Sequence, residues 1–423
     1  AAVQAARQAF RSWGQASPSA RRKVLKAFAE AIRKHHDQLA ELETLDVGRT
    51  IRDNRAGYIR GLASTIEYFA DLAVNVGSEA YPMPSGYLNY VLRSPVGVAG
   101  LITPWNVPMM LFTWKLAPAL AFGNTVVLKP AELTPLGAWR LAQLAHEAGM
   151  PPGVLNVVHG FGPNSAGAYI TEHPDVDLIS FTGESATGKT IMAAAAKSLK
   201  RVSFELGGKG ANIVFADADL DRAVKVSLQA AFHNQCQFCV AGSRLLVQRS
   251  IYEPFLEKFT AAARELRPGD PMNPETTLGA LISAEHLQRV AGYIEAARQS
   301  GATIRLGGDR PALSAPFNQG NFLNATIIEG LPSEHRVCQE EIFGPVVAAL
   351  PFDSEEEAVE IANGVDYGLS AVIQTRDVGR ALRVASALNV GNVWVNDFFV
   401  RDLRTPFGGM KQSGIGREGG TYS

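Results

Sequence analysis

Residues 201–244 read RVSFELGGKGANIVFADADLDRAVKVSLQAAFHNQCQFCVAGSR. One set of strand-like segments ends here at residues 202–206, and a second set begins at Ala211. Glu205 closes an apolar run that is typical of a buried strand, where a carboxylate is costly unless it has a partner or a chemical role. Cys239 follows a helix-like segment whose pattern ends at Asn234, Gln235 and Gln237. A carboxylate, a glycine pair and a thiol therefore lie at the junction between two parts of the chain.

The carboxylate and the thiol allow two interpretations. Glu205 as a general base and Cys239 as a nucleophile would support covalent catalysis, in which water later opens an acyl-enzyme. The alternative is structural, with a cysteine packed in the core and a glutamate at the end of a strand. These residues alone leave both interpretations open.

Apolar strand candidates alternate with helix candidates upstream of this junction. The strand candidates are residues 96–103, 125–129, 154–159, 176–182 and 202–206. The segments between them are long enough for crossover helices, which is typical of a parallel doubly wound sheet. Such sheets bind nucleotides at the carboxyl ends of their strands.

The alternation continues downstream of the junction. Further strand candidates are residues 245–248, 303–306, 346–350, 371–374 and 393–396. They predict a second α/β domain, so the fold class is α/β with a doubly wound parallel sheet and a second unit of the same class.

The remaining segments are helical at the start of the chain and strand-like after it. Apolar residues such as Val3, Ala6 and Phe10 recur at helical spacing, so the first 75 residues are mostly amphipathic helix. Prolines and a glycine interrupt a strand-like pattern at 81–91, which predicts an exposed ribbon, suited to be an arm for another subunit. The expected divisions are a first domain at 1–75 and 96–206, the arm at 76–95, a second domain at 207–407, and a C-terminal segment at 408–423 that returns towards the oligomerisation region.

The composition is that of a globular protein. Lysines and arginines number 40 and acidic residues 41, which excludes a global field that would recruit nucleic acid or an anionic membrane. Prolines and a lysine interrupt the most apolar stretch, residues 96–122, so it cannot be a plain membrane-spanning helix. The three cysteines are too few for a disulfide scaffold and have no zinc-ligand company, which predicts a reducing, cytoplasmic compartment and no metal site.

Residues 183–190 read GESATGKT and fit the phosphate-binding pattern GxxxxGK[ST]. A strand candidate precedes this segment, a helix candidate follows it, and Asp217 could end a metal-binding strand, so a nucleoside triphosphatase is one alternative. A weaker inference from the same residues is that a helix N-terminus flanked by glycines binds a phosphate group. The pyrophosphate of a dinucleotide fits this inference equally well.

Several further motifs occur in one order along the chain. They are TPWN at 103–106, GNTVVLKPAELTP at 123–135, FTGESATG at 181–188, FELGGK at 204–209, the segment around Cys239, EEIFGP at 340–345 and PFGGMKQSGIGREGG at 406–420. Together they closely resemble the NAD(P)-dependent aldehyde dehydrogenase superfamily. The resemblance implies a doubly wound NAD-binding domain, a catalytic α/β domain and a protruding β-arm. It also implies a homodimer or homotetramer that acts on a small-molecule aldehyde.

The same resemblance implies catalytic roles for three residues. Cys239 is then the nucleophile, whose thiolate attacks the aldehyde carbon to give a thiohemiacetal. The Asn106 amide and the Cys239 backbone N–H would hold the oxyanion. After hydride leaves for the nicotinamide, Glu205 would activate the water that hydrolyses the thioester. The glutamate also argues against the family's branch that transfers the acyl group to coenzyme A, which usually lacks it.

Cofactor contacts follow from the resemblance as well. Lys129 and Glu132 match residues at the adenosine ribose, where a carboxylate binds the 2′ and 3′ hydroxyls and repels a 2′-phosphate, so NAD is favoured over NADP. Gly183 and Gly188 would let the pyrophosphate approach the helix start. The full implied set, of which the last two lie on the nicotinamide side, is Thr103, Pro104, Trp105, Lys129, Glu132, Gly162, Gly183, Glu184, Gly188, Leu206, Glu341 and Phe343.

The chain departs from the family's usual pattern at two positions. Cys236 stands where a glycine is usual, either as packing or as a redox partner of Cys239. Glu184 replaces a serine, and this change also occurs in a subgroup of the family that acts on muconic semialdehydes.

Residues 394–420 are similar to that subgroup, the 2-hydroxymuconic and 2-aminomuconic semialdehyde dehydrogenases. The arginine that matches Arg401 binds the substrate carboxylate there, and a bidentate guanidinium suits a dicarboxylic semialdehyde. The implied substrate contacts are Arg401, Arg60, Trp114 and Phe407. Asp397 could neutralise Arg401, which leaves a general or betaine-type aldehyde dehydrogenase as the alternative.

Overall fold

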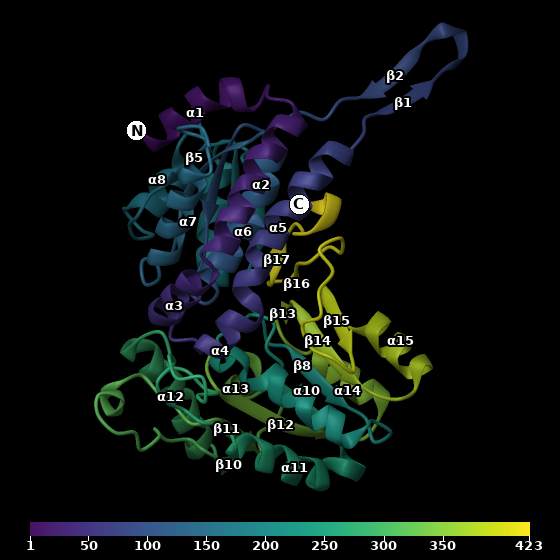
Figure 1. The fold of residues 1–423 in the computed structure, drawn as a ribbon. Coiled ribbons are helices and arrows are strands. Elements are labelled where there is room, and N and C mark those ends of the chain that lie inside the picture. Colours follow the sequence, from purple (N-terminus) through teal and green to yellow (C-terminus); the bar gives the residue numbers. More distant parts are fainter.

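The computed structural model describes residues 1–423 as two α/β units with a hairpin that projects from them (Figure 1). The N-terminal helices are α1 (Ala2–Trp13), α2 (Pro18–Lys34), α3 (His36–Val47), α4 (Ile51–Asp53) and α5 (Ile59–Asn75), with a π-helical turn at Asn54–Tyr58. The Ser17 side chain accepts a hydrogen bond from the Ala20 N–H at the start of α2, which is the usual cap of a helix. The predicted helical character of this region is confirmed.

The first sheet contains five parallel strands. They are β3 (Val98–Ile102), β4 (Thr125–Lys129), β5 (Leu155–Val157), β6 (Leu178–Thr182) and β7 (Arg201–Glu205). Their order is β7-β6-β3-β4-β5, so the chain first moves outward from β3 on one side and then returns to the other side. A topological switch point therefore lies between β3 and β6. The crossover helices are α6 (Pro108–Ala121), α7 (Leu136–Glu147), α8 (Ala166–Glu172) and α9 (Ser185–Ala196).

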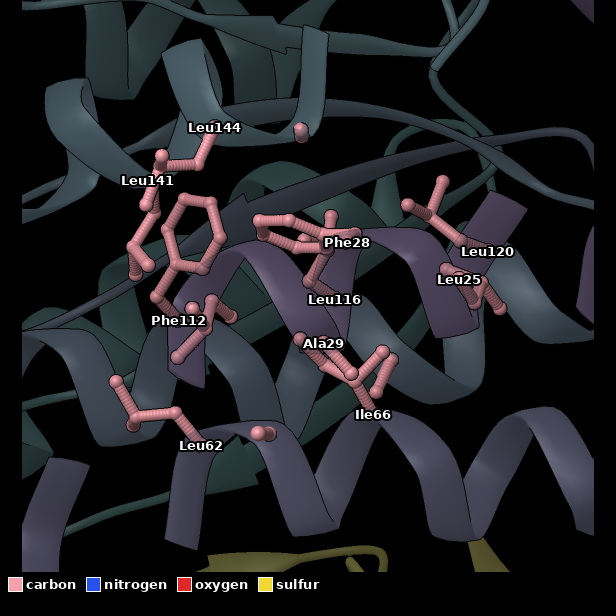
Figure 2. Close-up of a cluster of buried hydrophobic side chains, with 14 of the residues drawn as sticks. Leu25, Phe28, Ala29, Leu62, Ile66, Phe112, Leu116, Leu120, Leu141 and Leu144 are labelled. Carbon is pink, nitrogen blue, oxygen red and sulfur yellow. The ribbon is translucent and has the colours of Figure 1, made fainter. Parts of the chain in front are cut away.

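The N-terminal helices pack on α6 and α7 through a core of apolar side chains (Figure 2). Phe28 of α2, Leu62 of α5 and Phe112 of α6 are buried in it. Burial of each such side chain contributes about 1.5–3 kcal/mol to folding. The opposite side of α6 carries Trp114, which belongs to another cluster, so this helix connects the N-terminal layer with the interior of the site. No helix of the structure has the length and apolarity that crossing a membrane would need.

The second sheet has seven strands. They are β8 (Ala211–Val214), β9 (Arg244–Gln248), β10 (Thr303–Leu306), β11 (Thr326–Glu329), β12 (Val346–Phe352), β14 (Ser370–Gln374) and β15 (Asn392–Val395), in the order β10-β11-β12-β9-β8-β14-β15. All neighbours are parallel except β10 with β11. Leu246 packs in one core while Leu245 and Val247 pack in another, because alternate side chains of a strand point to opposite faces.

Helices cover the second sheet on its two sides. They are α10 (Leu220–Phe232), α11 (Tyr252–Arg264), α12 (Ala284–Gln299), α13 (Arg336–Gln339), α14 (Glu355–Asn363) and α15 (Val378–Ala387). The predicted fold class, a doubly wound parallel sheet with a second α/β unit, is confirmed, and each strand candidate named from the sequence is a strand. Strand β11 is absent from the prediction.

The projecting hairpin consists of β1 (Glu79–Pro82) and β2 (Leu88–Val91), which pair antiparallel around the turn at Pro84–Gly86. Its side chains are exposed, among them Tyr87, Leu88 and Tyr90. The exposed ribbon expected at 81–91 is therefore present, and Figure 1 shows it extending away from the rest of the chain. A two-stranded hairpin gains little stability by itself, so its apolar side chains suit a contact with another surface.

The C-terminal segment adds short strands to both units. β16 (Met410–Lys411) pairs with β13 (Tyr367–Gly368), which precedes β14 of the second unit. β17 (Gly414–Ile415) pairs antiparallel with β7, and Gly414 lies opposite Glu205. The segment that follows residue 407 therefore extends the first sheet beside the expected catalytic base.

Candidate active site

The expected catalytic side chains lie where the two sheets meet end to end. β7 finishes with Glu205, and a short turn leads directly to the start of β8 at Ala211. Cys239 precedes β9, the neighbour of β8, so it lies at the amino ends of the second sheet. The carboxyl ends of the first sheet and the amino ends of the second share this junction, and the site occupies it.

The loop that carries Cys239 begins with an unusual turn. Helix α10 ends at Phe232, and the next residues, Asn234, Gln235 and Cys236, have φ values of 50°, 55° and 57°. Residues other than glycine rarely adopt this left-handed region, and asparagine tolerates it better than most. The turn ends the helix where the sequence indicated, and it carries the chain back towards Asn106.

The Asn106 side chain is buried and is held against the Cys239 loop. Its Nδ2 donates to the Gln237 carbonyl at 3.0 Å, and Asn234 Nδ2 donates to the Asn106 carbonyl at 3.1 Å. An amide nitrogen carries two hydrogens, so Asn106 keeps one for a further acceptor. This arrangement fits the predicted role of Asn106 as a donor to an oxyanion.

The glycine pair after Glu205 permits two close approaches. A Cβ at Gly208 would lie 2.1 Å from the Cys239 carbonyl oxygen, and a Cβ at Gly207 would lie 2.5 Å from Glu341 Oε2. The Gly208 N–H also donates to Glu341 Oε1 at 2.8 Å. A larger residue at 208 would displace the backbone of the nucleophile loop, and one at 207 would displace the Glu341 carboxylate.

Glu205 is a buried carboxyl group without a hydrogen-bond partner. It is 3% exposed, and neither oxygen has a partner in the protein. Burial raises the pKa of Glu205 well above its ordinary value and the charge of Glu418 raises it further, while Lys115, Arg417 and Arg401 oppose the shift. A carboxylate whose pKa lies closer to neutrality is a better general base than an ordinary one.

Glu418 and Lys115 form a buried ion pair beside Glu205. Lys115 Nζ lies 2.6 Å from Glu418 Oε1 and 2.9 Å from Ser180 Oγ. Sequence analysis gave neither residue a role. Lys115 carried a usable signal, because a lysine inside an apolar helix is rarely buried unless it is paired. Glu418 had no such signal, since its partner lies 303 positions away.

Two substitutions in this ion pair should shift the pH profile of turnover in opposite directions. Glu205 must lose its proton to activate water, so hydrolysis should rise with pH through the Glu205 pKa. The Glu418 charge raises that pKa and the Lys115 charge lowers it. Glu418→Gln should therefore move the acid limb of kcat to lower pH, and Lys115→Met should move it to higher pH. The measurement is kcat against pH where a burst shows that hydrolysis limits turnover. Shifts in the same direction would contradict this electrostatic account.

The Cys239 thiol is only partly buried as a residue, but its sulfur is well shielded. Burial raises its pKa, and the charges of Glu341 and Glu205 raise it further. The resting thiol is therefore protonated at neutral pH, and its proton must leave as the sulfur attacks. Burial also raises the pKa of Glu341 to about 7, against the opposing hydrogen bond from Gly208. Two carboxyl groups whose pKa values burial has raised thus face the nucleophile.

The other two cysteines are free and buried. Cys236 packs in the apolar cluster that also contains Phe238, and burial raises its pKa to about 12. This environment favours the interpretation of Cys236 as packing, since a redox partner needs an accessible thiolate. No group of three or more His, Cys, Asp or Glu side chains in the structure could hold a metal ion.

The strand ends at the switch point fit a dinucleotide. Thr103 follows β3 and Thr182 ends β6, and the buried hydroxyl of each has no hydrogen-bond partner in the protein. Helix α9 begins at Ser185, and Glu184 caps it without a side-chain hydrogen bond, so the first N–H groups of α9 are available to an anion. A Cβ at Gly183 or Gly188 would collide with a neighbouring side chain.

The remaining expected cofactor residues surround these strand ends. Lys129 ends β4, and its buried ammonium lies 3.0 Å from Glu132 Oε2. Trp105 packs edge-on against Phe343 with ring centroids 5.2 Å apart, and Phe343 has a left-handed φ of 61°. Pro104 is half-buried between Thr103 and Trp105, and Gly162 lies in the loop after β5. Leu206 packs against Gly188.

The nucleoside triphosphatase alternative is wrong. A phosphate-binding loop needs residues 183–188 to form an open loop before the lysine, but α9 already begins at Ser185. Lys189 Nζ instead donates to Gln412 Oε1 at 2.8 Å. The Asp217 carboxylate accepts hydrogen bonds from Thr375 and Arg380, so it is not a vacant metal ligand.

Arg401 is a partly buried cation with unused donors. Its Cζ lies 3.4 Å from the ring centroid of Trp114 and 5.2 Å from that of Phe407. Nη2 donates to the Glu418 carbonyl at 3.3 Å, whereas the buried Nε and Nη1 have no partner in the protein. Burial lowers the pKa of Arg401 to about 10, so the guanidinium stays charged at neutral pH.

Neither Asp397 nor Arg60 forms an ion pair or a side-chain hydrogen bond with Arg401. Asp397 does not neutralise Arg401: its carboxylate lies 3.7 Å from Arg222 and accepts a hydrogen bond from the Phe398 N–H. The expectation of a neighbouring acid fails because the strand turns at Asn396, which has a left-handed φ of 55°. Arg60 is exposed on α5, and its role as a substrate contact stays a prediction.

Known proteins resemble the chain over its whole length. A 2-hydroxymuconic semialdehyde dehydrogenase of Pseudomonas sp. (strain CF600) is 50% identical over 431 aligned residues, which cover 100% of this chain and 88% of the relative. A 2-aminomuconic semialdehyde dehydrogenase of Danio rerio is 48% identical over 426 residues, covering 100% and 87%.

Solved structures agree with the fold. A putative aldehyde dehydrogenase from Burkholderia cenocepacia superposes with a TM-score of 0.97 at 45% identity, covering 99% of this chain and 85% of that one. A betaine aldehyde dehydrogenase from Staphylococcus aureus, solved in complex with NAD+, superposes with a TM-score of 0.96 at 40% identity, covering 100% and 83%.

The family model of the aldehyde dehydrogenases matches residues 1–423, from the first residue to the last. The resemblance inferred from the sequence motifs is thereby confirmed. With half of its residues shared with one such relative and the same fold as another, the chain belongs to the aldehyde dehydrogenase family.

Proposed function

We propose that the chain oxidises a carboxylated semialdehyde of the 2-hydroxymuconic type to the carboxylic acid, with NAD and water. Membership of the aldehyde dehydrogenase family supports the reaction class. The observation that carries the substrate class is Arg401, a partly buried cation with unused donors beside the rings of Trp114 and Phe407. The semialdehyde dehydrogenases among the relatives act on aldehydes of this kind, by their names.

Cys239 is the nucleophile of the proposed reaction. Its sulfur adds to the aldehyde carbon, and the thiol proton leaves to one of the carboxylates that face it. The oxyanion of the resulting thiohemiacetal is held by the free hydrogen of Asn106 Nδ2 and by the Cys239 backbone N–H. The hydrogen bond from Asn106 to Gln237 fixes that amide before substrate arrives, so no reorganisation is needed at the moment of attack.

NAD is the proposed cofactor. The chemistry that a bound NAD supplies is acceptance of a hydride. The first turn of α9 would hold the pyrophosphate, Thr103 and Thr182 offer unused hydroxyls, and Glu132 would bind the ribose hydroxyls and disfavour a 2′-phosphate. Trp105 and Phe343 would border the nicotinamide. The betaine aldehyde dehydrogenase that resembles this chain was solved with NAD+.

Glu205 is the proposed base for the second half of the reaction. Its carboxylate removes a proton from water, and the water oxygen attacks the thioester carbon, so that the Cys239 sulfur leaves and the carboxylic acid forms. The Glu205 oxygens have no other hydrogen-bond partner, which leaves them free for water. Glu418 and Lys115 stand behind this base and tune its pKa.

Arg401 would bind the carboxylate at the far end of the substrate. A guanidinium offers two parallel N–H donors to a carboxylate, and here Nε and Nη1 are unused. A betaine-type substrate is disfavoured, because a quaternary ammonium group needs aromatic faces without a competing cation. Arg401 already occupies the face of Trp114.

Replacing Arg401 with Ala tests this assignment. We expect kcat/KM for 2-hydroxymuconic semialdehyde to fall at least about 30-fold, since removal of one member of a buried charge pair costs about 2–5 kcal/mol. The value for a neutral aldehyde should change little. The matched control is Arg404→Ala in the same loop, because Arg404 is exposed and paired with Asp402 at 2.6 Å. Equal losses for both substrates would reject the carboxylate role.

We also propose that the chain assembles as a homodimer or homotetramer through its hairpin and works in the cytoplasm. The exposed tyrosines and leucines of β1 and β2 support the assembly, and the three free cysteines support a reducing compartment. A monomeric mass by light scattering of the purified chain would reject the assembly.

A further inference from the structure

A polar contact links the N-terminal helices to the loop that carries Cys239. The Tyr58 hydroxyl lies 2.7 Å from His233 Nε2. The two rings also stack, with centroids 5.7 Å apart and an angle of 11° between their planes. Tyr58 closes the π-helical turn that precedes α5, and His233 directly follows the last residue of α10. The contact therefore joins residues 175 positions apart, one on each side of the junction between the units.

Tyr58 is itself held in place by a fully buried arginine. The Cζ of Arg49 lies 3.7 Å from the centroid of the Tyr58 ring, and the Arg49 side chain is 0% exposed. Arg49 donates to Glu43 at 2.7 Å and to Asn54 at 2.6 Å, so its own position is fixed by charge and hydrogen bonding. A cation against an aromatic face restrains the ring, and the tyrosine therefore presents its hydroxyl in one direction.

The protonation states define the direction of the hydrogen bond. Burial raises the pKa of Tyr58 to about 12, so the phenol keeps its proton. Burial lowers the pKa of His233, so the imidazole is neutral at neutral pH. A phenol is the better donor and a neutral imidazole nitrogen the better acceptor, so the Tyr58 O–H donates to His233 Nε2.

The turn that follows His233 needs anchors. Asn234, Gln235 and Cys236 all have left-handed φ values, and such residues persist only where the surrounding structure holds them. Downstream, Asn234 Nδ2 donates to the Asn106 carbonyl, and Gln235 Nε2 donates to the Ala280 carbonyl at 3.0 Å. Upstream, the hydrogen bond from Tyr58 is the only one made by the His233 side chain. Loss of that bond would release one end of the turn and leave the other end attached.

We propose that Tyr58 is a positioning residue that, through His233, holds the turn that aims the Cys239 sulfur. The inference rests on the proposed role of Cys239 as the nucleophile. The polar and ring contacts of Tyr58 are with His233 and Arg49, and Tyr58 is not among the residues assigned to the substrate or to NAD, so its effect should fall on attack by the thiol rather than on binding.

Tyr58→Phe tests the proposal, because it removes the hydroxyl and keeps the ring over Arg49. We expect alkylation of Cys239 by iodoacetamide, located by peptide mass, to slow about tenfold, as suits the loss of one buried hydrogen bond. The NADH burst should slow equally, with KM for the aldehyde unchanged. The matched control is Tyr68→Phe on the following helix, α5, whose hydroxyl makes no hydrogen bond to the protein, and it should behave as the parent.

Variants of the histidine separate positioning from general destabilisation. His233→Gln retains an acceptor for the Tyr58 hydroxyl and should stay within about threefold of the parent, whereas His233→Leu should fall as far as Tyr58→Phe. In the double variant with His233→Leu, Tyr58→Phe should cause no further loss, because both changes break one contact. If Tyr58→Phe does not fold, the comparison of Gln with Leu at 233 still tests the contact.

Specific results would overturn the proposal. They are alkylation of Tyr58→Phe within twofold of the parent, equal rates for the Gln and Leu variants, or additive losses in the double variant. Since alkylation is measured at Cys239 itself, these results leave the proposed reaction untouched. Turnover that survives Cys239→Ala would instead reject the nucleophile and leave the Tyr58 effect on the loop measurable.

Discussion

Replacing Cys239 with Ala should abolish NADH formation from every aldehyde, with kcat/KM lower by at least about 10⁴-fold. The reason is that the proposed reaction has no path without a sulfur–carbon bond, and loss of a covalent nucleophile commonly costs this much or more. The measurement is absorbance at the NADH band under excess NAD and aldehyde. Dissociation of NAD from the variant, followed by fluorescence, should stay close to the parent value, because Cys239 is not among the residues expected to hold the cofactor.

The matched controls are the other two cysteines. Cys236→Ala and Cys338→Ala remove buried thiols that have no assigned chemical role, so both variants should retain activity within a few fold, with some loss of stability from the cavity. Turnover in Cys239→Ala within tenfold of the parent would reject the nucleophile. Loss of activity in Cys236→Ala at unchanged stability would give that thiol a role beyond packing.

The sheet architecture was predictable from the sequence because its signal is local. A buried parallel strand is a short apolar run between turn residues, and residues 125–129 and 346–350 show that pattern without ambiguity. The strand ends then indicated where polar residues would gather, and Thr103, Thr182 and Glu205 do lie at carboxyl ends of the first sheet. Strand β11 was not predicted, although it is as long as several of the strands that were.

The parts of the site that were missed depend on contacts between distant positions. Lys115 and Glu418 become an ion pair only when α6 and the C-terminal segment meet, and Tyr58 meets His233 only across the junction. No spacing rule applies to such pairs. The expectation for Asp397 failed for the same reason, since four positions along the chain suggested proximity to Arg401 and a left-handed turn separated them.

The phosphate-binding pattern illustrates a related limit. Its letters matched over residues 183–190, but the chemistry depends on where the helix begins, and the start of α9 at Ser185 converts most of the motif into helix. One feature of the motif is retained in the structure, namely a helix N-terminus flanked by glycines that can bind an anion. The N-terminus of α9 can therefore still bind a phosphate, but Lys189 takes no part, because its ammonium donates to Gln412.

The C-terminal segment contributes more to the site than its position in the sequence suggests. β17 pairs with β7 so that Gly414 lies opposite Glu205, and a Cβ at Gly408 would lie 2.8 Å from Glu205 Oε1. The same segment supplies Glu418, whose charge raises the Glu205 pKa. The Glu418 carbonyl also accepts a hydrogen bond from Arg401 Nη2. The same C-terminal segment therefore contacts both Glu205, the proposed base, and Arg401, the proposed receptor for the substrate carboxylate.

Replacing Glu205 with Gln should leave one fast turnover and then stop the enzyme. Formation of the thioester does not require the base for water, so NADH should appear in a burst close to one equivalent per active site. The steady state should be about 10²–10⁴-fold slower, the usual contribution of a general base. Rapid mixing with excess NAD and aldehyde measures both phases. The steady-state rate should also lose the acid limb that the raised Glu205 pKa gives to the parent.

Two observations distinguish a lost base from a damaged site. Hydroxylamine attacks thioesters without assistance, so it should restore turnover in Glu205→Gln far more than in the parent, where water is already activated. Stability should not fall, because a buried carboxyl group whose pKa is raised opposes folding at every pH above its unfolded pKa, and a neutral amide removes that penalty. A variant without a burst would show that Glu205 acts before the thioester forms, as the acceptor of the Cys239 proton. In that case the two carboxylates that face the sulfur have different tasks, and water activation falls to Glu341, whose pKa of about 7 suits it equally well.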